Sequence, residues 1–148
     1  MDESHLSSAL NIEQRTYEFP WTEGIFRDSL RAGYSSWVVT SPEQQVLAYA
    51  LMTLAAGEAH ILNLCVDPAV QRQGLGRFLL SHLQRVARGG GAELLLLEVR
   101  KSNRAAITLY LKSGFHQLGQ RKNYYPAHTG AEDAWLLAYD LKSKTATA

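Results

Sequence analysis

The sequence is poor in cysteine and carries almost no excess charge. Cys65 is the one cysteine among 148 residues, which excludes an internal disulfide. The five histidines are scattered and none forms a ligand pair with Cys65, so we expect no metal site. A formal net charge of +1 provides no global field that would attract nucleic acid or an anionic membrane.

Long apolar runs are missing as well, although 46% of the residues are hydrophobic. No run approaches the ~18–20 residues that cross a bilayer. The N-terminus, MDESHLSSAL, is acidic where a signal peptide would be basic. We therefore expect a cytoplasmic protein without a membrane or nucleic-acid partner. The length suits one domain, spanning residues 1–148, with residues 142–148 as a loose polar tail.

Periodicity and turn residues predict an α/β fold with a mixed sheet. The expected order is two helices, three strands in a meander, a helix, a strand, a helix and two strands. The Leu94–Leu97 run indicates a central strand that is buried on both faces. The expected helices are His5–Phe19, Thr22–Leu30, Gly74–Arg88 and Arg104–Lys112, and the expected strands are Tyr34–Thr40, Val46–Leu54, Ala59–Val66, Ala92–Val99, Phe115–Tyr124 and Ala134–Leu141.

The segment Gln71–Gly76 is the most informative stretch of the sequence. A strand ends before it, and a helix opens on Gly74 and Gly76. Free N–H groups at a helix start attract anions, and glycines let a phosphate approach the backbone. The alternative is that the two glycines only shape a tight turn. A Walker loop and a dinucleotide fingerprint are both excluded, since the Lys-Ser/Thr pair and the third glycine are missing.

The residues around this loop resemble the GNAT superfamily of N-acetyltransferases. The stretch Q-R-Q-G-L-G-R is similar to the family motif Q/R-x-x-G-x-G/A, and V-D-P precedes it. The downstream pattern L-E-V-R-x-S-N-x-x-A-I-x-L-Y-x-x-x-G-F extends the match over Asn63–Phe115. The resemblance implies a GNAT fold with a mixed, mostly antiparallel sheet, about four helices and a first strand that is missing or very short.

More narrowly, the chain resembles the ribosomal-protein-alanine N-acetyltransferases. The matching blocks are I-E-Q-R-x-x-x-F-P-W, L-E-V-R-x-S-N, R-K-N-Y-Y-P and E-D-A. This resemblance implies transfer of the acetyl group of acetyl-CoA to the N-terminal alanine of small-subunit ribosomal protein eighteen, by direct attack in a ternary complex. Acetyl-CoA is then a co-substrate, no metal is needed, and we expect a monomer or weak dimer.

The resemblance also implies which residues bind acetyl-CoA. A free backbone N–H in a bulged strand would bind the acetyl carbonyl, so the side chain of Cys65 need not act. Packing is the better interpretation of that thiol. Asn103 matches an asparagine that contacts the coenzyme; the alternative is that Asn103 caps the next helix, and both roles are compatible. The expected coenzyme-binding residues are Leu64, Cys65, Val66, Gln71, Arg72, Gln73, Gly74, Leu75, Gly76, Arg77 and Asn103.

Glu98 and Tyr110 are the candidate catalytic residues. An α-amino group has a pKa near ~8, so a base must remove its proton. Glu98 ends a very apolar strand, where burial would raise its pKa; the alternative is a structural carboxylate paired with Arg100 or capping a helix. Tyr110 could protonate the leaving thiolate, and the alternative is a tyrosine at the edge of the core. The resemblance favours the catalytic role for both.

Aromatic residues beside prolines are the candidates for acceptor binding. Phe19 and Trp21 flank Pro20, and core packing explains them about as well. Tyr124 and Tyr125 cannot both face inward on an extended strand, so at least one should be exposed. Glu132 and Asp133 could attract a cationic terminus, whereas Arg121 and Lys122 serve either the coenzyme or only the solvent.

Two other functions stay open from the sequence alone. The acceptor could be another protein terminus or a small amine, or the chain could bind acetyl-CoA without catalysis. The pair of Glu98 and Tyr110 argues against a pure binding module, which needs neither residue.

Overall fold

The computed structural model describes residues 1–142, which form two compact units. The first unit contains residues 1–53 and 62–83, and the second contains 54–61 and 84 onward. The expected polar tail lies almost wholly outside the described residues. In order along the chain, the elements are η1 Glu3–His5, α1 Leu6–Thr16, α2 Glu23–Arg31, β1 Ser35–Thr40, β2 Val46–Ala55, β3 Glu58–Val66, η2 Pro68–Val70, α3 Leu75–Gly89, β4 Leu94–Arg100, α4 Arg104–Lys112, β5 His116–Ala127 and β6 Gly130–Asp140.

The six strands are hydrogen-bonded in the order β1-β2-β3-β4-β6-β5. Strands β1 and β2 pair antiparallel, as do β4 with β6 and β5 with β6, whereas β3 and β4 are parallel. This confirms the mixed, mostly antiparallel sheet. Within residues 1–142, no strand precedes α1, in agreement with a missing first strand.

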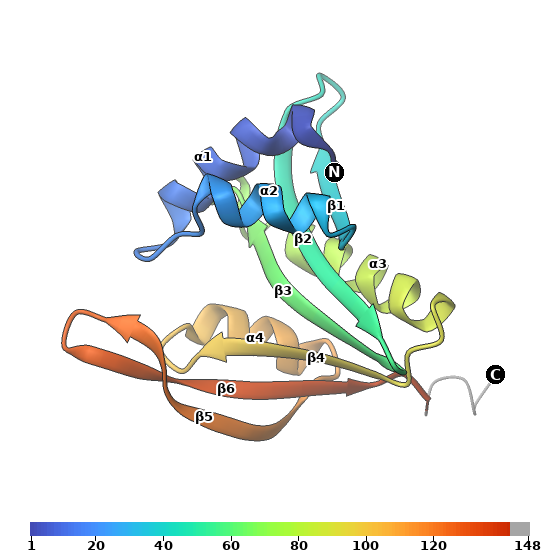
Figure 1. The fold of residues 1–148 in the computed structure, drawn as a ribbon, viewed down its shortest axis with the longest axis vertical. Helices are drawn as coiled ribbons and strands as arrows, with labels where there is room; N and C mark the ends of the chain where they lie inside the picture. The colour runs from blue at the N-terminus through green and yellow to red at the C-terminus, as the bar shows by residue number, and fades with distance from the viewer. Residues whose placement is uncertain (143–148) are drawn as a thin grey trace. The chain divides into compact units, whose positions relative to one another are not determined.

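The first unit packs α1 and α2 against strand residues around Tyr49. Its buried cluster is Leu6, Ala9, Ile12, Phe26, Val46, Tyr49, Leu51 and Cys65. The side chain of Thr22 caps α2 by accepting a hydrogen bond from the Ile25 N–H. In Figure 1, α1 and α2 lie next to each other.

The first helix is shorter than predicted, ending at Thr16 rather than at Phe19. Tyr17 leaves the helix with an extended backbone, φ −113° and ψ 142°. Its hydroxyl donates a hydrogen bond of 3.2 Å to the Leu64 carbonyl on β3. A contact across 47 residues therefore sets the helix end, and the local pattern does not contain it.

The second unit contains β4 and the long β5–β6 hairpin, which is visible at the lower left of Figure 1. The prediction that β4 is buried on both faces was wrong. Leu95, Leu97 and Val99 are buried, whereas Leu94 and Leu96 on the other face are half-buried. β5 and β6 are longer than predicted because they continue into a hairpin turn at residues 128–129.

None of the helices in residues 1–142 is long and apolar enough to cross a membrane.

Candidate active site

The loop Gln71–Gly76 lies at the start of α3, within the first unit. The first hydrogen bond of the helix runs from the Phe78 N–H to the Gly74 carbonyl at 2.9 Å. The N–H groups of Leu75, Gly76 and Arg77 therefore precede the intrahelical ladder. Gly74 has φ +85°, and a Cβ built on it would meet no heavy atom within 4 Å. The loop thus presents backbone donors beside open space, which suits an anion.

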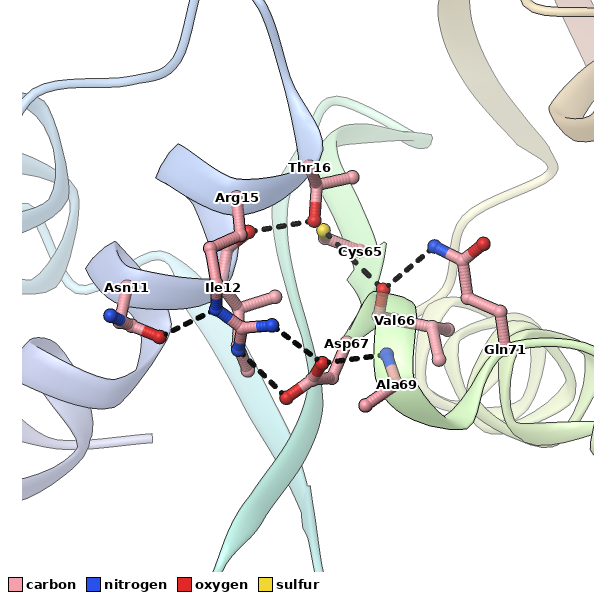
Figure 2. A network of polar contacts seen from close by, with 9 residues as sticks. All are labelled: Asn11, Ile12, Arg15, Thr16, Cys65, Val66, Asp67, Ala69 and Gln71. Carbon is pink, nitrogen blue, oxygen red and sulfur yellow. Dashed lines mark hydrogen bonds and ion pairs between the residues drawn. The ribbon is translucent and has the colours of Figure 1, made fainter.

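A polar network anchors the segment before this loop (Figure 2). From α1, the Arg15 guanidinium makes a bidentate pair with the Asp67 carboxylate, at 3.0 and 2.9 Å. Asp67 also accepts the Ala69 N–H at 2.9 Å, and the Gln71 side-chain amide donates to the Val66 carbonyl at 3.0 Å. The hydrogen bonds from Arg15 lower the pKa of Asp67 and raise the pKa of Arg15. Charge-assisted, bidentate bonds of this kind fix geometry well.

The end of β3 holds Leu64, Cys65 and Val66. Cys65 is buried, and burial raises the pKa of its thiol. A buried thiol with a raised pKa is a poor nucleophile, so packing explains Cys65. Within the second unit, residues Glu58–Ile61 of β3 pair in parallel with Leu94–Leu97 of β4.

A second network surrounds Glu13, a carboxylate with 2% of its surface exposed. It accepts hydrogen bonds from the Tyr49 hydroxyl, from the Asn63 side-chain amide at 2.8 Å and from the Trp21 N–H at 2.8 Å. Burial raises the pKa of Tyr49, with Glu13 as a further cause. Glu13 therefore fixes the segment that carries the two aromatic acceptor candidates.

Those two aromatic residues differ in their surroundings. Trp21 is half-buried and its ring packs edge-on against Phe26, with 5.2 Å between centroids. Phe19 is 39% exposed. Core packing therefore accounts for Trp21, at least in part, and Phe19 is the more accessible candidate.

Glu98 lies in the second unit, and 8% of its side chain is exposed. Its Oε1 atom lies 3.4 Å from Nε2 of His60 and 3.4 Å from Nε of Arg121. A hydrogen bond to Glu98 raises the pKa of Tyr124. Among residues 1–142, no group hydrogen-bonds the buried Oε2 atom. A buried carboxylate with one oxygen that lacks a hydrogen-bond donor can accept a proton there.

The tyrosines beside Glu98 are set by an irregularity in β5. The pairing register with β6 shifts between Arg121 and Tyr125, and Asn123 has φ +54°. The Asn123 N–H bonds the Asp133 carboxylate at 3.0 Å. Because the strand bulges here, the adjacent rings of Tyr124 and Tyr125 meet edge-on at 4.9 Å instead of pointing to opposite faces.

The expected exposure of one tyrosine is confirmed, because Tyr124 is 49% exposed. Tyr125 is half-buried beneath the Arg100 guanidinium, 4.5 Å from its ring centroid. Burial raises the pKa of Tyr125 to about 12. Tyr124 is thus the tyrosine of this pair that solvent and a ligand can reach.

Glu132 already has protein partners. Its carboxylate accepts hydrogen bonds from Arg100 at 3.1 Å and from the Ser102 N–H at 2.9 Å. Hydrogen bonding from Ser102 is the largest cause that lowers the pKa of Glu132. Arg100 therefore pairs with Glu132. These contacts, and the bond from Asn123 to Asp133, explain both acidic residues as parts of the hairpin, without an acceptor.

Tyr110 lies in α4, and Asn103 is the residue that precedes this helix. Tyr110 is buried, with its ring 5.7 Å from that of Phe115. The Asn103 side chain caps α4 by accepting the Ala106 N–H at 3.2 Å. The capping role of Asn103 is confirmed, and its coenzyme contact stays a prediction. Residues 1–142 contain no group of three or more His, Cys, Asp or Glu side chains that could hold a metal ion.

Comparison with known proteins decides the family. The model of the acetyltransferase (GNAT) family matches residues 6–115. The chain belongs to this family. It is 41% identical over 141 residues to the [ribosomal protein bS18]-alanine N-acetyltransferase of Escherichia coli strain K12, with 95% of each chain covered. It is 36% identical over 140 residues to the protein of that name from Haemophilus ducreyi, covering 94% of this chain and 96% of the other.

The fold of this acetyltransferase agrees with a solved structure. The crystal structure of the ribosomal-protein-S18-alanine N-acetyltransferase from Escherichia coli matches with a TM-score of 0.88 at 40% identity. The match covers 95% of this chain and 90% of the other. Family and relatives together make the chain an acetyl-CoA-dependent N-acetyltransferase.

Three further residues of the acetyltransferase have contacts that the local sequence pattern does not predict. His60 reaches Glu98 because β3 and β4 pair in parallel, which aligns His60 with Leu96. Arg15 reaches Asp67, 52 residues away, and Glu13 lies in the same helix. An acidic residue within an apolar helical stripe was the one available signal for Glu13, because buried carboxylates need several partners.

Proposed function

We propose that the chain acetylates the N-terminal alanine of ribosomal protein bS18 in the cytoplasm. The observation that carries the proposal is 41% identity over 95% of both chains to an enzyme with that name. Glu98, with His60, Arg121 and Tyr124 around its carboxylate, supplies a candidate general base for this reaction. We further propose that the two compact units work as one acetyltransferase domain, in a monomer or weak dimer.

The first unit supplies the proposed coenzyme contacts. The N–H groups of Leu75, Gly76 and Arg77 bind the pyrophosphate, and Arg72 and Arg77 add positive charge beside it. Gln71 and Gln73 complete the loop, with Gln71 also holding the Val66 carbonyl. In the second unit, Asn103 adds a coenzyme contact besides capping α4.

The acetyl carbonyl is bound by the end of β3 in this proposal. The carbonyls of Leu64 and Val66 accept bonds from Tyr17 and Gln71. In an extended strand, the N–H of a residue points to the same edge as its carbonyl. The Leu64 and Val66 N–H groups therefore lie on that edge, where one of them can stabilise the oxyanion that forms during attack.

Glu98 is the proposed general base and Tyr110 the proposed general acid. Glu98 takes a proton from the acceptor's ammonium group, directly or through water. The neutral amine attacks the thioester carbon, so that a C–N bond forms and the C–S bond breaks. The Tyr110 hydroxyl protonates the leaving thiolate. Phe19, Trp21, Tyr124 and Tyr125 bind the first residues of the acceptor.

An acetyl-transfer assay with matched peptides tests the acceptor. Peptides that begin with the bS18 sequence and differ only in their first residue are compared at equal concentration, together with polyamines. We expect the alanine-starting peptide to give the highest kcat/KM, by about tenfold or more, since a small pocket discriminates even one methylene. Equal rates for all peptides would refute the alanine specificity. A preference for polyamines would instead establish a small-amine acetyltransferase.

A further inference from the structure

The neighbours of Glu98 differ in what they can do with a proton. The Arg121 guanidinium keeps its proton at any working pH, so it can only balance charge. The Tyr124 hydroxyl donates to Glu98, and this bond raises the pKa of Tyr124, so that the phenol keeps its proton. The His60 imidazole belongs to the one class of side chain that commonly gains and loses a proton between pH 5 and 8.

The reaction releases one proton per turnover, which must leave the site. An ammonium acceptor and acetyl-CoA give an amide, free CoA thiol and one H⁺. If Glu98 takes the first proton of the ammonium, and the thiolate takes a proton from Tyr110, the second proton of nitrogen restores Tyr110. The proton on Glu98 is then the surplus one. With 8% of its side chain exposed, Glu98 has little direct contact with solvent.

Resting on the proposed role of Glu98, we propose that His60 is the proton exit of this acetyltransferase. The His60 Nε2 atom lies 3.4 Å from the Glu98 oxygen, and 33% of the His60 side chain is exposed. It therefore touches both the buried carboxylate and the solvent. After each transfer, Nε2 takes the proton from Glu98, and the imidazole passes it to water or buffer.

The backbone fixes this arrangement. His60 pairs with Leu96 in the parallel ladder of β3 and β4, and Glu98 is two residues further along β4. Residues two apart on a strand share a face, so His60 and Glu98 project to the same side of the sheet. Arg121, Tyr124 and Tyr125 from β5 are further titratable or charged groups around the Glu98 carboxylate.

Chemical rescue tests the exit role. The variant His60→Ala is assayed with saturating acetyl-CoA and peptide, at low and high buffer concentration and with added imidazole. We expect kcat to fall by about tenfold in dilute buffer, since proton transfer by a positioned side chain contributes at least that much. Both KM values should stay close to those of the wild type. Added imidazole, or concentrated buffer, should restore most of kcat.

Arg121→Gln is the matched control, because Arg121 lies at the same 3.4 Å from the same oxygen and cannot relay a proton. Its kcat should not respond to imidazole. Full activity of His60→Ala in dilute buffer would overturn the proposal, as would a loss that neither imidazole nor buffer restores. A buffer-dependent kcat in Tyr124→Phe but not in His60→Ala would assign the exit to Tyr124 and refute it too.

The variant Glu98→Gln separates this proposal from the proposed function. If Glu98→Gln is inactive while His60→Ala is fully active, the base stands and only the exit fails. If Glu98→Gln is fully active, the base assignment itself fails.

Discussion

Two carboxylates, one in each unit, have contrasting environments. Glu13 in the first unit accepts three hydrogen bonds, from Tyr49, Asn63 and Trp21. Glu98 in the second unit has its Oε1 atom 3.4 Å from the His60 imidazole and 3.4 Å from the Arg121 guanidinium, and its Oε2 atom is buried without a hydrogen-bond partner among residues 1–142. Both side chains are almost fully buried. Burial alone therefore does not distinguish a structural acid from a reactive one.

The difference lies in how completely each charge is satisfied. A carboxylate that accepts several hydrogen bonds holds the groups that donate them in place. A carboxylate oxygen that has no hydrogen-bond donor can accept a proton from a further group. We therefore expect Glu13 to stabilise the fold and Glu98 to take part in the chemistry, and four variants can break or sharpen this contrast.

Glu98→Gln should have the largest effect. The amide cannot accept the proton, so kcat should fall by about a thousandfold, within the range for a lost general base. Acetyl-CoA affinity and thermal stability should stay near those of the wild type. Steady-state kinetics measures kcat, and calorimetry measures acetyl-CoA affinity and thermal stability. Glu93 is an exposed residue just before β4, and Glu93→Gln is the control. Unchanged turnover would remove Glu98 from the mechanism.

Gly74→Glu, in the first unit, should have the second largest effect, on acetyl-CoA binding. A carboxylate beside the proposed phosphate site, on a backbone with φ +85°, should weaken acetyl-CoA binding by about a hundredfold through charge repulsion. Gly74→Ala imposes the same backbone strain without the charge, and it should keep more of the affinity. Calorimetric titration with acetyl-CoA compares the two, and equal affinities would contradict a phosphate site here.

Glu13→Gln should damage stability rather than chemistry. Three donors face this side chain, and a glutamine offers one acceptor oxygen, so at least one buried donor loses its partner. The free energy of unfolding should fall by about 2 kcal/mol. Urea titration measures it, with the exposed Glu23→Gln as the control. A stable variant with a strongly reduced kcat would reverse the roles assigned to the two carboxylates.

Tyr110→Phe should have the smallest of the four effects. Without the hydroxyl, water can protonate the leaving thiolate less efficiently, so kcat should fall by about tenfold. Tyr139→Phe is the matched control, since its ring lies in the same aromatic stack, 5.4 Å from Phe115. The values of kcat at saturating acetyl-CoA are compared for the two variants. An equal loss of kcat in both would indicate that Tyr110 contributes through packing alone.

Local chemistry predicted the second unit's helix well. The bounds of α4 agree with the prediction because Asn103 caps its start and Gly114 follows its end. Gly114 has φ +99°, and a Cβ there would lie 2.8 Å from the Tyr139 ring, so both backbone and packing require glycine. Helix ends that are set by residues within a few positions of the boundary can therefore be predicted from the sequence.

Features set by distant partners were not predictable in this way. The early end of α1 depends on Tyr17 reaching Leu64, and the meeting of Tyr124 with Tyr125 depends on the bulge at Asn123. The contact of His60 with Glu98 requires the parallel register of β3 and β4. Resemblance supplied Glu98 and Tyr110 as candidates, and the surroundings of Glu98 emerged only from the fold.

The ion pair that anchors the proposed coenzyme loop also determines how the enzyme should respond to acid. Arg15 holds the pKa of Asp67 below its ordinary value of 3.8. Its contribution to stability is thus complete above the unfolded pKa and is lost only as the pH falls through the lower, folded value. In mildly acidic solution the anchor keeps its charge. A decline of activity there reports on the acceptor amine and the groups that move its proton, not on a loosened loop.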